Sequence, residues 1–156
     1  MWKRALLALA IILVAIQLAR PARNSTSHPP GADDFIVRFS PPAAIAAGLR
    51  AACYDCHSDS TRYPWYAKVQ PVAWWLADHI NEGKEHLNLS QFGAYSPKEQ
   101  QRKLNRMSDE IVNRKMPLRS YTLLHADARL TDAQVNAISE WLDAVDDTPP
   151  STQPGM

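Results

Sequence analysis

The sequence predicts an all-α fold in which helices are joined by long loops. The first observation is that apolar residues recur at helical spacing, as in the stripe Val135, Ile138, Trp141, Leu142 and Val145. The second is a pair of capping boxes, Ser96-Pro97-Lys98-Glu99 and Thr131-Asp132-Ala133-Gln134, which are typical of helix starts. The third is that the alternating pattern of a half-buried strand is scarce.

The chain length of 156 residues suits one domain with appendages. We expect a membrane anchor or signal segment at 1–22, a linker rich in Pro, Ser and Gly at 23–34, the folded domain at 35–146 and a disordered, proline-rich tail at 147–156. The formal net charge of +1 and the lack of a basic stripe give no indication of a nucleic-acid partner.

The N-terminal segment predicts export. Trp2, Lys3 and Arg4 precede an apolar run from Ala5 to Ala19, which only Gln17 interrupts. This run is short for a spanning helix, but no good cleavage site follows it. We therefore expect an uncleaved anchor, with a cleaved signal peptide as the alternative. In both cases the domain lies on the periplasmic side of the cytoplasmic membrane.

The folded domain is expected to begin with a short extended piece at 35–39. A helix rich in alanine follows at 43–52, with Ser40 as its N-cap. Pro71 opens the next helix, and Gly83 is its expected C-cap. One face of this second helix is expected to carry Val72, Trp75, Leu76, His79 and Ile80.

Two further helices complete the domain. The first begins at the Ser96 capping box, carries Leu104, Met107 and Ile111 on one stripe, and must end near Lys115 because Pro117 follows. The second begins at the Thr131 capping box.

The motif Cys53-Tyr54-Asp55-Cys56-His57 lies between the first two helices and contains both cysteines of the chain. The pattern C-x-x-C-H is the attachment signature of haem c. Each thiol can add across one haem vinyl group, and the histidine can bind the iron as the proximal ligand. We therefore predict one covalent haem c on Cys53, Cys56 and His57. A domain with so many loops also fits this prediction, because a large apolar disc would replace part of its core.

Two other chemistries remain open for this motif. A redox disulfide of the thioredoxin type is expected near a βαβ pattern, which is missing here. A zinc site usually needs four Cys or His ligands at close spacing, and no second cysteine pair exists.

Met116 is the predicted distal ligand of the iron. It follows a helix end, on a segment that Pro117 keeps extended. A thioether is a soft ligand that raises the reduction potential. His79 is the alternative, through bis-histidine ligation. Met107 fits a core position better.

Several aromatic and basic residues are candidates for the walls of a haem pocket. Aromatic rings can cover the haem, and N–H, O–H or guanidinium groups can bind its propionates. The candidates are Arg62, Tyr63, Trp65, Trp74, Trp75, His79 and Tyr121.

These residues together resemble the bacterial haem-binding domain family. The resemblance rests on residues 53–58, on Arg62-Tyr63-Pro64-Trp65-Tyr66, on residues 71–76 and on Met116-Pro117-Leu118, and it extends from about Asp34 to Leu142. Ala126 departs from the family, in which proline often follows the histidine that matches His125. The resemblance implies a small, cytochrome c-like protein, anchored at its N-terminus, with covalent haem c and His57 as proximal ligand.

The function that we expect is one-electron transfer with unidentified redox partner proteins. Six-coordinate iron leaves no site for a substrate, so an enzymatic role is the less favoured interpretation. The alternatives are a haem sensor or small peroxidase with an open or labile sixth position, and a thiol-redox protein that uses Cys53 and Cys56.

Overall fold

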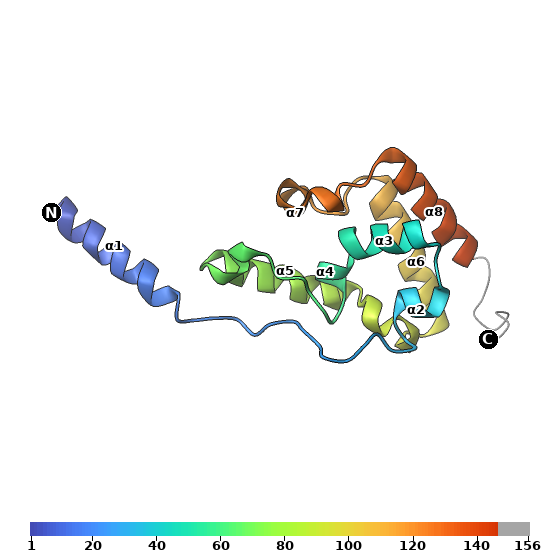
Figure 1. Cartoon of the computed structure of the whole chain (residues 1–156), viewed down its shortest axis with the longest axis horizontal. Coiled ribbons are helices and arrows are strands. Elements are labelled where there is room, and N and C mark those ends of the chain that lie inside the picture. Colours follow the sequence, from blue (N-terminus) through green and yellow to red (C-terminus); the bar gives the residue numbers. More distant parts are fainter. Residues whose placement is uncertain (147–156) are drawn as a thin grey trace.

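The computed structural model describes residues 1–146, and every element in this range is a helix or a 3-10 turn (Figure 1). The prediction of an all-α fold is therefore confirmed for this part of the chain, whereas the expected disordered tail lies outside it. The longer helices are α1 (Trp2–Ile16), α3 (Ala43–Ala52), α5 (Val72–His86), α6 (Pro97–Val112) and α8 (Asp132–Asp146). The short elements are α2 (Phe35–Phe39), α4 (Tyr54–His57), η1 (Trp65–Lys68), η2 (Leu89–Ala94), α7 (Arg119–Leu124) and η3 (Ala126–Ala128).

Helices α6 and α8 pack along each other and carry the centre of the core. Both predicted stripes supply it, with Leu104, Met107 and Ile111 from α6 and Val135, Ile138 and Leu142 from α8 all buried. Trp141 and Val145 pack against this core but are only partly buried. Both predicted capping boxes are present, because Glu99 N–H donates to Ser96 Oγ at 3.4 Å and Gln134 N–H donates to Thr131 Oγ1 at 3.2 Å.

The prediction of an extended piece at 35–39 is wrong, because this segment is helix α2. Asp34 caps it by accepting hydrogen bonds from Ile36 N–H at 3.0 Å and Val37 N–H at 3.2 Å. Phe35 is fully buried, with its ring centroid 4.8 Å from that of Phe92. This aromatic contact and the cap offset the poor helix propensity of a short segment of β-branched and aromatic residues.

Two predicted helix boundaries are also wrong. Ser40 does not cap α3; it ends α2 in the left-handed conformation, with φ 44°, and Pro42 precedes α3. Gly83 lies inside α5, which continues to His86. Leu76 and Ile80 are buried as expected, but Val72 and Trp75 on the predicted inner face are exposed.

Helix α1 is solvent-exposed over almost all of its length and carries no buried residue. Within residues 1–146, no helix is both long enough and apolar enough to cross a membrane, so the spanning anchor expected at 1–22 finds no support in the structure.

Candidate functional site

A cavity of about 380 Å³ lies between α4, α5, α6 and the segment after α6. Six of the predicted site residues line it, namely Cys53, Cys56, His57, His79, Met116 and Tyr121. Its walls are mostly apolar, with Ala52, Leu87, Met107, Ile111, Pro117 and Leu118 among the lining residues. The structure therefore brings the motif and the predicted distal methionine to one cavity, although they are far apart in the sequence.

Both cysteines lie on a single helical turn. Cys53 ends α3 and begins α4, and its carbonyl accepts the N–H of Cys56 at 3.3 Å and that of His57 at 3.0 Å. No disulfide joins them. Burial raises the pKa of Cys53 to about 12 and that of Cys56 to about 11. Thiol-redox chemistry needs the thiolate, so these surroundings disfavour the thiol-redox interpretation.

The imidazole of His57 is held by two backbone carbonyls. Its Nδ1 lies 2.8 Å from the carbonyl oxygen of Gly83 and 3.1 Å from that of Leu87. Since carbonyls only accept hydrogen bonds, Nδ1 must carry the proton and donate it. Burial also lowers the pKa of His57, which keeps the ring neutral. The unprotonated Nε2 is therefore available to bind a metal, and the hydrogen bond to Nδ1 orients the ring.

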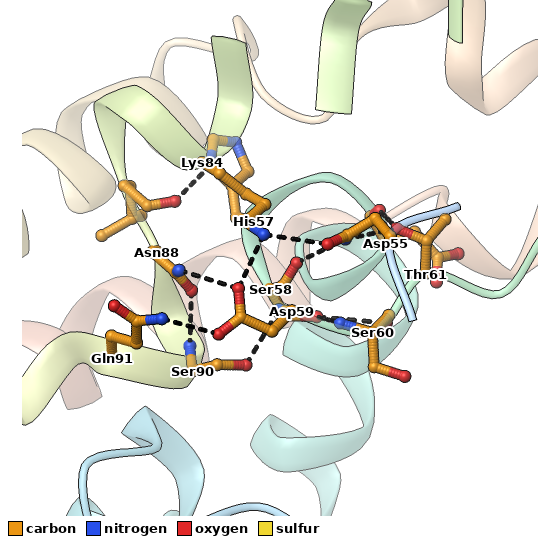
Figure 2. Close-up of polar contacts among 12 residues, drawn as sticks. Asp55, His57, Ser58, Asp59, Ser60, Thr61, Lys84, Asn88, Ser90 and Gln91 are labelled. Carbon is orange, nitrogen blue, oxygen red and sulfur yellow. Dashed lines mark hydrogen bonds and ion pairs between the residues drawn. The ribbon is translucent and has the colours of Figure 1, made fainter. Parts of the chain in front are cut away.

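The segment after His57 is fixed to α5 and η2 by the carboxylate of Asp59 (Figure 2). Lys84 Nζ lies 2.7 Å from Asp59 Oδ1, and Asn88 Nδ2 and Gln91 Nε2 donate to the carboxylate at 3.0 and 2.9 Å. Partial burial alone would raise the pKa of Asp59, but these hydrogen bonds together hold it below its usual value. Because Lys84 and Asn88 flank Gly83 and Leu87, the network holds the two carbonyls that orient His57.

Arg62 and Tyr121 both bind Asp55, the buried residue between the two cysteines. The Arg62 guanidinium donates to the carboxylate at 3.0 and 3.2 Å, and the Tyr121 hydroxyl donates to it at 2.6 Å. Burial and this hydrogen bond raise the pKa of Tyr121. Arg62 also lies 3.4 Å from Asp127 and does not line the cavity. Arg62 therefore links Asp55 of α4 to Asp127 of η3.

The backbone after α6 turns Met116 towards the cavity. Arg114 adopts the left-handed conformation, with φ 56°, and the N–H groups of Lys115 and Met116 both donate to the carbonyl of Glu110 at 3.0 Å. The Arg114 side chain donates to the carbonyl of Leu130 at 2.8 Å and pairs with Asp132. Met116 is thus half-buried on a segment tied to both α6 and α8, and its ligation of iron stays a prediction.

Besides Arg62, four predicted pocket residues lie outside the cavity lining. Trp65 is 77% exposed, and the ring of Trp75 contacts that of His79, with the centroids 4.1 Å apart and the planes tilted by 44°. Tyr63 and Trp74 instead contact the N-terminal segment, since the hydroxyl of Tyr63 accepts the N–H of Asn24 at 2.7 Å and Trp74 Nε1 donates to the carbonyl of Ala19 at 2.7 Å. Residue type and sequence position alone could not distinguish these rings from pocket walls.

Two basic residues of α6, Lys103 and Arg106, line the cavity but were not predicted from the sequence. The Lys103 ammonium donates to the carbonyl of His86 at 2.7 Å and lies 4.1 Å from the ring centroid of Tyr95. Desolvation and then the neighbouring charge of Arg102 lower the pKa of Lys103. The available signal was their spacing: Lys103 lies four residues before Met107 and Arg106 lies four residues before Glu110, and residues four apart share a helix face.

Among residues 1–146, no group of three or more His, Cys, Asp or Glu side chains is arranged to hold a metal ion by itself. The zinc interpretation of the C-x-x-C-H motif gains no support from the structure.

Gly83 is where α5 touches the motif. A Cβ at this position would lie 2.7 Å from the carbonyl oxygen of Cys56, a backbone atom that cannot move without shifting α4. We expect Gly83→Ala to push α5 away from α4 and to weaken the hydrogen bond from His57 Nδ1 to the carbonyl of residue 83. The free energy of unfolding should fall by about 1–3 kcal/mol, the usual cost of overpacking. Gly31→Ala is the control, because a Cβ there meets no atom within 4 Å. Urea unfolding of both variants measures the difference, and equal midpoints would contradict the prediction.

Comparison with known proteins identifies the family. Searches of curated proteins and of solved structures return no significant match. The model of the family described as "Haem-binding domain" matches residues 11–144, which include the motif, the cavity and Met116. The chain therefore belongs to the haem-binding domain family, and it binds haem.

Proposed function

We propose that this protein carries one haem c, bound through thioethers to Cys53 and Cys56, with His57 as the proximal ligand of the iron. The observation that carries the proposal is that all three side chains line one largely apolar cavity, while the orientation of His57 leaves Nε2 free. Both thiols line this cavity, so a haem bound there would place a vinyl group within reach of each, and net addition of S–H across each vinyl double bond would give the two thioethers.

The residues around the cavity fit a haem. Apolar side chains from α6 and from the segment 116–118 supply walls for the macrocycle. Lys103 and Arg106 would hold its propionates, since both are cationic and both line the cavity. Arg62, which the sequence suggested for this role, is already engaged by Asp55.

We propose Met116 as the distal ligand and one-electron transfer as the function. When bound, the haem supplies a reversible one-electron couple. Met116 lies on a segment held by Glu110, Leu130 and Asp132, which supports a defined position for its thioether. We further propose that the domain is exported to the periplasmic side of the cytoplasmic membrane, with residues 1–22 as a lipid-associated anchor or, alternatively, a cleaved signal segment. Its partners are proposed to be redox proteins.

Absorption spectroscopy tests the proposal. The full chain is co-expressed with a cytochrome c maturation system, and its oxidised and reduced spectra are recorded with and without carbon monoxide. We expect a methionine-to-iron charge-transfer band near the red end of the visible spectrum and little reaction with carbon monoxide. If the band is missing and carbon monoxide binds readily, the iron has an open or labile sixth position, and the sensor or peroxidase interpretation replaces electron transfer.

A further inference from the structure

Helix α1 has an unusual surface for a helix outside a protein core. From Ala5 to Ile16 every residue is apolar, on all sides of the helix, and none is buried by residues 1–146. A helix that is apolar all round is normally surrounded by a protein core or by lipid. Trp2, Lys3 and Arg4 precede this apolar surface, and Arg20 follows it.

The C-terminal end of α1 is joined to the domain by hydrogen bonds at one place, the junction of η1 and α5. The Gln17 side chain donates to the carbonyl of Gln70 at 3.2 Å and accepts the N–H of Gln70 at 2.9 Å. The carbonyl of Ala19 accepts hydrogen bonds from Gln70 Nε2 at 3.0 Å and Trp74 Nε1 at 2.7 Å. Gln70 is buried, so this junction fixes where α1 leaves the domain.

Large apolar side chains are exposed at this same end of the domain. We call Trp65, Val69, Val72, Trp75, Leu123 and Leu124 the aromatic end; Trp65, Leu123 and Leu124 are 77%, 74% and 66% exposed. Tyr66 and His125, with ring centroids 6.0 Å apart, bring η1 and α7 together. In Figure 1, α1, the start of α5 and α7 lie towards one side of the molecule, and α2 and α8 lie towards the other.

We propose that the aromatic end docks on a lipid bilayer surface, beside α1 in the same bilayer. Lipid can cover all sides of α1, whereas a docked protein would cover only one. Exposed tryptophans favour the interface between headgroups and acyl chains, and Arg20, Arg23 and Lys68 near the junction would meet anionic headgroups. The inference rests on the proposed lipid association of residues 1–22 and is independent of the haem.

Spin labels on the full chain test the proposal in vesicles of phosphatidylethanolamine and phosphatidylglycerol. Single cysteines are introduced by Trp65→Cys and Leu123→Cys in the aromatic end, by Ile11→Cys in α1 and by Val37→Cys on α2 as the matched exposed control. Collision of each label with oxygen, which concentrates in lipid, is compared with collision with a nickel chelate, which stays in water. We expect the oxygen-to-nickel ratio at positions 65, 123 and 11 to exceed that at position 37 several-fold.

Each result decides the proposal. If positions 65 and 123 behave like position 37, docking is overturned, whether or not position 11 enters lipid. If the labels at positions 65 and 123 are protected from the nickel chelate only at high protein-to-lipid ratios, and their spectra show spin–spin broadening, a second copy covers the aromatic end. Docking on lipid is then overturned as well. The chain without an added cysteine should take up no label. Uptake would contradict haem attachment instead, and docking is then measured in a Cys53→Ser, Cys56→Ser background.

Discussion

Replacing both Cys53 and Cys56 by serine is expected to abolish covalent haem attachment. In the wild type, the haem should stay with the polypeptide on a denaturing gel, because each thioether is a covalent bond between sulfur and a former vinyl carbon. The hydroxyl of serine does not replace the thiol in this addition. Haem-linked peroxidase staining of the gel should therefore fall from full intensity to background.

The single variants are the controls for this prediction. Cys53→Ser and Cys56→Ser each leave one thiol on the same cavity, so each should keep haem on the gel through one thioether. The remaining vinyl group stays conjugated with the ring and should shift the reduced spectrum to longer wavelength. Circular dichroism of the double variant monitors whether the chain still folds. Haem retained on the gel by the double variant would contradict the assignment of haem c.

Replacing Met116 by alanine is expected to lower the reduction potential of the iron on the order of 0.1 V, a fraction of the roughly 0.8 V range that axial ligands span. The thioether favours reduced iron, and alanine supplies no ligand in its place. The same variant should lose the charge-transfer band and gain rapid binding of carbon monoxide. Spectroelectrochemical titration and carbon monoxide mixing measure the two effects.

Met107→Leu is the matched control for Met116→Ala. Met107 lines the same cavity and is 8% exposed, but it belongs to the core stripe of α6. Leucine conserves its volume, so we expect at most about 1.5 kcal/mol of destabilisation and little change in potential. An unchanged potential in Met116→Ala, or an equal shift in Met107→Leu, would remove Met116 from the iron.

Much of the helical framework could be predicted from local sequence. The capping boxes at Ser96 and Thr131 and the stripes of α6 and α8 depend on interactions within one or two turns, which residue spacing records directly. The segment 35–39 could not, because its helix depends on Phe92 and the rest of a distant aromatic core. The prediction of Gly83 as a helix C-cap failed for a similar reason. The glycine lets α5 approach the backbone of Cys56 closely, and this contact with a distant segment has no signature in the local sequence.

The reactive groups of the site could be read from the sequence, since C-x-x-C-H specifies two thiols and an imidazole within five residues whatever surrounds them. How these groups are oriented depends on contacts between distant segments of the chain. The carbonyls of Gly83 and Leu87, 26 and 30 residues beyond His57, set its tautomer, and Asp55 draws Arg62 and Tyr121 to the motif. Such contacts join segments that lie far apart in the sequence, at separations that no motif specifies. They form only once α5, α6 and α7 have packed around the C-x-x-C-H turn.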